Sequence, residues 1–144
     1  MVLLTYITFT ALLVIASLHV VWGLGILWPV KEEQALVQAI AGFRGADKMP
    51  PAGASFLVAA LVLVAAMIAL DLGEISSLFP HIITIVGGVA VLFVFLGRAI
   101  LGCTPFWSKL TPEQPFRRLD TVFYTPLCFA LGGSFSILTW SSVF

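Results

Sequence analysis

Residues 54–72 read ASFLVAALVLVAAMIALDL, and Asp71 is the only charged residue among them. A helix of about 20 apolar residues crosses the roughly 30 Å hydrocarbon core of a bilayer, because each residue adds about 1.5 Å. Three further stretches have the same apolar character, at about residues 5–28, 82–103 and 121–140. Backbone polar groups in lipid must find partners within their own segment, so these spans are expected to be helices. The sequence therefore predicts an all-α fold, a four-helix transmembrane bundle forming one domain over residues 1–144.

The composition of the whole chain excludes several classes of protein. Hydrophobic residues make up 60% of it and charged residues 10%, with a formal net charge of zero, and the mean hydropathy is +1.12. An average soluble domain carries about 25% charged residues. The chain cannot cover a globule with polar surface, which excludes a soluble enzyme, a nucleic-acid-binding protein and a disordered tail. Its expected surroundings are a lipid bilayer, and no nucleic acid is expected among its partners.

Positive charges are unevenly distributed among the connections between the spans. The first and third connections each hold three, which are Lys31, Arg44 and Lys48 in one and Lys109, Arg117 and Arg118 in the other. The two termini and the connection 71–80 hold none. The positive-inside rule therefore predicts that both termini lie on the non-cytoplasmic side. The first span is interpreted as a retained helix rather than a signal peptide, because no Lys or Arg precedes it and its apolar run is too long.

Within the first connection, apolar residues recur at the spacing of an α-helix. Leu36, Ile40 and Phe43 recur at helical spacing within residues 32–43, among polar neighbours. Such a pattern indicates a short helix lying in the membrane interface, where it either has a role of its own or simply covers the helix ends. Glycines at 42 and 45 and a Pro-Pro pair then break it before the second span.

A set of polar residues falls inside the predicted spans, near their cytoplasmic ends. Ionisable side chains at this depth usually face the bundle interior and mark functional sites. Asp120, Tyr124 and Cys128 are spaced i, i+4, i+8 and share one helix face, and His19 and Trp22 share another. The candidate ligand-binding pocket consists of His19, Trp22, Arg98, Asp120, Tyr124 and Cys128.

Several of these residues allow a structural interpretation as well. Arg98 either pairs with Asp120 or an anion, or extends to the headgroups. Asp120 either caps a helix that starts at Thr121, or lies inside a helix that starts at the capping box Thr111-Pro-Glu-Gln. Pro126 lacks an N–H, so the carbonyl of residue 122 needs another donor.

The remaining candidates also have two roles open to them. His19 suits a helix–helix hydrogen bond as well as a ligand contact. Tyr124 suits an interfacial anchor, and Cys128 a small packing residue.

Cofactor and metal chemistry find little support. His19 and His81 lie near opposite ends of their spans, about 16 Å apart by helical rise, which is too far to share a haem iron. No spacing of His, Cys and carboxylate residues matches a zinc site. We therefore expect no cofactor and no metal. Ala65 and Ala69 form a small-xxx-small pair that predicts close helix packing, either within the chain or in a homo-oligomer.

A series of short motifs resembles a known family. They are His19-Val-Val-Trp-Gly, Trp28-Pro, Met49-Pro, Gly97-Arg98, Arg118-Leu-Asp120 and Tyr124-x-Pro-Leu-Cys128. The chain from His19 to Gly132 resembles an uncharacterised family of small four-span bacterial membrane proteins, catalogued as a domain of unknown function. The resemblance implies the fold and a bacterial inner membrane, and brings no activity. In that family's pattern Asn can stand where Asp120 is and Ser where Thr125 is, which favours a capping or hydrogen-bonding role for Asp120.

The leading functional hypothesis is a ligand-binding or accessory protein whose cytoplasmic-side pocket holds a small anionic or lipidic molecule. Arg98 would make the charge contact, His19 and Tyr124 the hydrogen bonds, and Trp22 a wall. One alternative is a membrane enzyme acting on a lipid, quinone or isoprenoid, with His19 or Tyr124 transferring the proton. Another is a structural or assembly subunit of a larger membrane complex.

Overall fold

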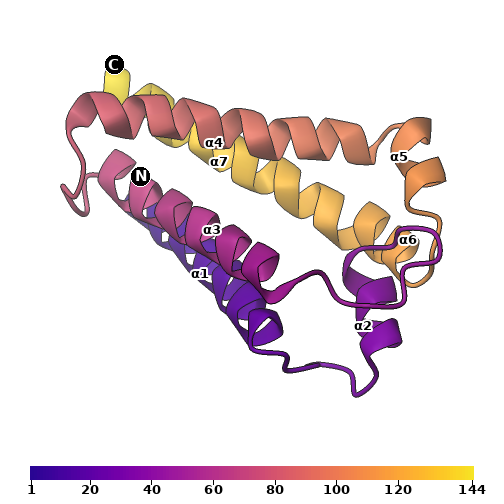
Figure 1. The fold of residues 1–144 in the computed structure, drawn as a ribbon. Helices are drawn as coiled ribbons and strands as arrows, with labels where there is room; N and C mark the ends of the chain where they lie inside the picture. Colours follow the sequence, from indigo (N-terminus) through magenta and orange to yellow (C-terminus); the bar gives the residue numbers. More distant parts are fainter.

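Four long helices dominate the computed structural model, which describes all residues, 1–144. They are α1 (Val2–Gly23), α3 (Ala52–Leu72), α4 (His81–Gly102) and a continuous fourth helix. This last one consists of α6 (Phe116–Leu119), the π-helical turn η1 (Asp120–Tyr124) and α7 (Thr125–Val143). All four are long and apolar enough to cross a membrane. The predicted all-α, four-span fold is confirmed (Figure 1).

The helices pack as two pairs. α1 lies against α3 and α4 against α7, and the contacts between the pairs are fewer. The pairs meet near the chain termini and diverge toward α2 (Glu33–Ile40), α5 (Pro105–Leu110) and α6 (Figure 1). We call these the terminus end and the α2 end. The positive-inside rule predicts that the α2 end is cytoplasmic.

The core joins the two pairs through small residues on α3. Ala65 and Ala69 are 4% and 0% exposed and pack in one cluster with Leu12 of α1 and Phe135 of α7. The predicted close packing at this small-residue pair therefore occurs within the chain. Only 29 of 144 residues are buried, and exposed large apolar side chains occur on all four long helices, as expected for helices surrounded by lipid.

The first span ends earlier than predicted. It was expected to continue to residue 28, but α1 ends at Gly23. The N–H of Gly25 donates to Trp22 O at 3.0 Å and that of Ile26 to Val21 O at 3.1 Å. This is a Schellman motif, in which Gly25 adopts a φ of +77° that glycine accepts without strain.

The fourth span begins earlier than Thr121, but the predicted capping box at Thr111 is wrong. Residues 111–115 are not helical, and the helix starts at Phe116. The Thr111 hydroxyl donates back to Trp107 O at 2.8 Å and ends α5, so it does not cap a following helix. Asp120 therefore lies inside the fourth span rather than at its N-cap.

The short helix expected within residues 32–43 forms as α2. Leu36 and Val37 are each 1% exposed, so the apolar side of α2 packs against protein, and α6 is the helix that it contacts most. Gly42 and Gly45 follow with φ of +66° and +71° and turn the chain back toward α3. A Cβ at Gly42 would stand 2.2 Å from the Phe116 ring, so this close approach requires glycine.

Candidate functional site

Asp120 is the centre of a polar cluster at the α2 end. Its side chain is 0% exposed and accepts a hydrogen bond from Arg98 Nη2 at 2.5 Å and one from Trp107 Nε1 at 2.9 Å. The Thr125 hydroxyl lies 3.4 Å from the same carboxylate. Of the alternatives that the sequence left open for Arg98, the structure shows the pair with Asp120. We call Arg98, Trp107, Arg117, Asp120 and Thr125 the Asp120 cluster.

Trp107 is part of this cluster, although the sequence did not single it out as a candidate site residue. Thr104 caps α5 by accepting the N–H of Trp107 at 3.2 Å, which fixes the start of the helix. The Arg98 guanidinium carbon then lies 4.6 Å from the centre of the Trp107 ring, in cation–π contact. The signal that could have indicated this placement is Thr104-Pro105, an N-cap followed by proline at the first helical position.

The π-helical turn η1 explains how the fourth span presents Asp120. Pro126 has no N–H to continue an α-helical pattern, and a turn of i→i+5 bonds precedes it, in which the N–H of Thr125 donates to Asp120 O. The wider turn brings Thr125 rather than Tyr124 beside the Asp120 carboxylate. Gly102 of α4 allows this approach, because a Cβ there would lie 2.2 Å from Thr125 Oγ1.

Tyr124 fastens α2 to the fourth span. Its hydroxyl donates to Ala39 O at 3.0 Å, and its ring lies 5.7 Å from that of Phe116. Glu113 adds two ties to the segment after α2, since its N–H donates to Gly42 O at 3.2 Å and its carboxylate accepts from Gly45 N at 3.4 Å. The α2 segment is thus held by the fourth span and the connection before it.

His19 and Trp22 lie apart from the Asp120 cluster, in a cavity of about 170 Å³ between α1, α2 and the start of α3. We call it the His19 pocket. Its lining is largely apolar and consists of His19, Trp22, Ile40, Ala41, Met49, Pro50, Ala54, Ser55 and Val58. The sequence did not single out Ser55, which is 7% exposed within an apolar span.

Hydrogen bonds fix the two aromatic side chains of this pocket. His19 Nδ1 lies 2.8 Å from Ile15 O, and Trp22 Nε1 donates to Trp28 O at 2.9 Å. A carbonyl can only accept, so in the neutral ring Nδ1 carries the proton and Nε2 is left as an acceptor. The two rings meet edge to face with centroids 5.1 Å apart.

The predicted site residues therefore form separate groups. Arg98 and Asp120 belong to one group and His19 and Trp22 to another, and Tyr124 joins η1 to α2 through its hydrogen bond to Ala39 O. Cys128 is a half-buried free thiol one turn further along α7. Whether any of them binds a ligand stays a prediction.

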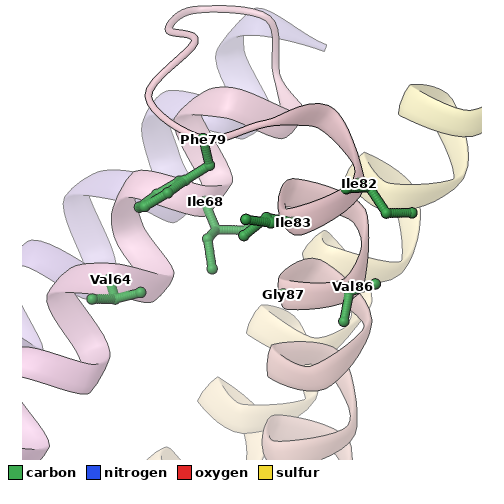
Figure 2. Close-up of a pocket in the computed structure, with 7 residues that line it drawn as sticks. All are labelled: Val64, Ile68, Phe79, Ile82, Ile83, Val86 and Gly87. Atoms are coloured by element: carbon green, nitrogen blue, oxygen red, sulfur yellow. The ribbon is translucent and has the colours of Figure 1, made fainter.

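A further cavity holds none of these residues. It lies between α3 and α4 near the terminus end, has a volume of about 340 Å³, and is lined by six hydrophobic residues and Gly87 (Figure 2). Figure 2 shows Phe79 at the side of the pocket nearest the 73–80 connection. No side chain there offers a hydrogen bond, so the cavity suits only apolar groups such as lipid tails.

Comparison with known proteins leaves the function open and decides the family. No curated protein and no solved structure matches the chain. One family model, described as "Protein of unknown function (DUF3995)", matches residues 12–135, which include both candidate sites. The chain therefore belongs to the DUF3995 family.

Proposed function

We propose that this protein binds a small lipidic molecule bearing a hydroxyl group, with the hydroxyl end in the His19 pocket. The observation that supports this proposal most directly is the orientation of His19. Because Ile15 O engages Nδ1 at 2.8 Å, the neutral ring offers Nε2 as an acceptor, and a hydroxyl is a matching donor.

The rest of the pocket suits the same ligand. Ile40, Met49 and Val58 provide an apolar lining, and the nearly buried Ser55 supplies the second polar side chain. A volume of about 170 Å³ is five to six times the roughly 30 Å³ that one water occupies in the liquid. That is room for the polar end of an amphipathic molecule, with its apolar tail extending into lipid.

The proposed setting is the bacterial inner membrane, with the α2 end in the cytoplasm. The six basic residues of the first and third connections lie at this end. The ligand would then enter the pocket from the cytoplasmic leaflet.

Native mass spectrometry of protein released gently from its own membrane tests the proposal. We expect a discrete non-protein adduct on the wild type and its loss, by at least tenfold, in His19→Phe, which keeps an aromatic ring but removes the acceptor. His81→Phe is the matched control, because His81 is exposed at the terminus end. An equal adduct on His19→Phe with an unchanged melting temperature contradicts the proposal, as does a stoichiometric protein companion in place of the adduct.

A membrane enzyme is the second candidate, and the same histidine favours it. In many enzymes the general base is a histidine whose Nδ1 is oriented by a hydrogen bond and whose Nε2 faces the substrate. The His19 ring has the same arrangement of its Nδ1. His19→Gln separates the two functions, because an amide can accept a hydrogen bond but cannot carry the proton. An adduct whose mass differs between wild type and His19→Gln indicates that the wild type converts its ligand. Identical adduct masses indicate binding without catalysis.

A further inference from the structure

Two arginines share one carboxylate in the Asp120 cluster. Arg98 Nη2 pairs with Asp120 Oδ1 at 2.5 Å, and Arg117 Nη1 stands 3.9 Å from Oδ2. The carboxylate is 0% exposed, and the direct ion pair with Arg98 neutralises its charge. Two positive charges against one negative charge leave the cluster with an excess of one positive charge.

Both arginines also retain unused hydrogen-bond donors. Arg98 Nη1 and Arg117 Nη1 are shielded from solvent and have no hydrogen-bond partner. A guanidinium has five N–H donors and no acceptor, and a charged donor left unpaired away from water is costly. The two side chains are nevertheless 27% and 30% exposed, so a part of each side chain other than Nη1 is open to the surroundings of the protein.

The level of the cluster in the membrane indicates which acceptor it would meet. Arg117 is the second residue of the fourth span, and Trp107 lies in the connection just before it, where aromatic side chains mark the interface. A membrane span ends near the polar headgroup region, which places the first turn of the fourth span close to lipid phosphates. Arginine binds phosphate oxygens through its planar fork more strongly than neutral donors do.

We infer that the Asp120 cluster is a binding site for the phosphate group of an anionic lipid, distinct from the His19 pocket. Arg117 makes the principal contact, because Asp120 engages it only at long range. Asp120 and Trp107 are positioning residues, since they hold the Arg98 guanidinium by a hydrogen bond and a ring face. The charge left over after this pairing attracts the anion.

Lipid titration followed by native mass spectrometry tests the site, with phosphatidylglycerol as the anionic probe and phosphatidylcholine as the zwitterionic one. The test variant is Arg117→Gln and the matched control is Arg118→Gln, an equal charge change at the exposed neighbour. We expect Arg117→Gln to weaken binding of the first phosphatidylglycerol at least fivefold and Arg118→Gln to leave it within twofold of wild type. Equal weakening in both variants means general attraction to basic surface and overturns the inference, as does equal binding of the two lipids.

Two additional arms complete the experiment. Displacement of phosphatidylglycerol by millimolar inorganic phosphate would identify free phosphate as a ligand of the same site, and its failure would assign the site to the lipid headgroup. His19→Phe should bind phosphatidylglycerol like the wild type, so failure of the His19 proposal leaves this one intact. Melting temperatures measured in detergent confirm that each variant is folded.

Discussion

Asp71 and Asp120 are both buried carboxylates near the ends of spans, and their partners are of opposite kinds. Asp71, 9% exposed at the terminus end, accepts from the Ser76 hydroxyl and from the backbone N–H groups of Leu78 and Phe79 at 3.0 and 2.8 Å. All of these donors lie within eight residues of it in the chain. Asp120 at the α2 end is held instead by Arg98 and Trp107, which are 22 and 13 residues away.

The difference shows two ways of keeping a carboxylate at a membrane boundary. Backbone dipoles around Asp71 stabilise its charge locally and order the 73–80 connection. The partners of Asp120 come from other elements, so its burial joins α4, α5 and the fourth span. Removing Asp71 should therefore loosen one connection, whereas removing Asp120 should loosen a whole end of the bundle.

The largest effect is expected from Asp120→Ala, because it leaves the Arg98 charge without its partner. Breaking a buried pair by removing one member costs about 3–5 kcal/mol. Asp120→Asn should cost less, since its single amide oxygen still accepts from one of the two donors, Arg98 or Trp107, while its NH2 group cannot accept from the other. Melting temperature in detergent is the measurement, and an Asp120→Ala protein as stable as Asp120→Asn would show that the ion pair contributes nothing.

A smaller and local effect is expected from Asp71→Ala. Two backbone N–H groups and a hydroxyl lose their acceptor, at a cost of about 1–3 kcal/mol for groups that water cannot fully reach. Hydrogen exchange should rise at Leu78 and Phe79 and stay unchanged at the α2 end. Glu74→Ala, at an exposed neighbour, is the control and should change exchange in neither region. Faster exchange throughout the bundle in Asp71→Ala would contradict a local role for the Asp71 contacts.

The smallest effect is expected from Tyr124→Phe, which removes only the hydrogen bond to Ala39 O. One such bond contributes about 0.5–1.5 kcal/mol. Exchange should rise in α2 while the melting temperature changes little. Tyr6→Phe, at a residue 49% exposed on α1, provides the same chemical change without a comparable contact. Equal exchange in the two variants would mean that α2 is held by packing alone.

The fold was predictable because its determinants are local and repetitive. Each span carries its own apolar signal, and the second and third spans form within two residues of the predicted limits. The predicted end of the first span was too late because apolar residues continue past Gly25. The only local sign of the helix end is Gly25, which adopts a left-handed conformation. The predicted start of the fourth span was wrong. The sequence around Thr111 matches both the end of one helix and the cap of the next, and in the structure its hydroxyl bonds to the last turn of α5.

The site was predictable only where charge required a partner. Asp120 was one of the partners that the sequence left open for Arg98, and the structure shows that pair. Trp107 was not assigned to the site, since an indole at an interface has the same sequence signal whether or not it binds a carboxylate. Tyr124 donates to a backbone carbonyl 85 residues away, and no side-chain pattern records such an acceptor.

The attachment of α2 sets an order of assembly. The residues of the fourth span and of the connection before it that contact α2 and the turn after it are Tyr124, Phe116 and Glu113, each at least 68 residues later in the chain than its contact. While the chain is being synthesised, α1 and α3 can pair as soon as both have entered the membrane, but α2 has no partner for its Leu36–Val37 side until the last span arrives. α2 therefore docks last, and the His19 pocket, which takes part of its wall from Ile40 and Ala41, is completed only when the whole chain has been inserted.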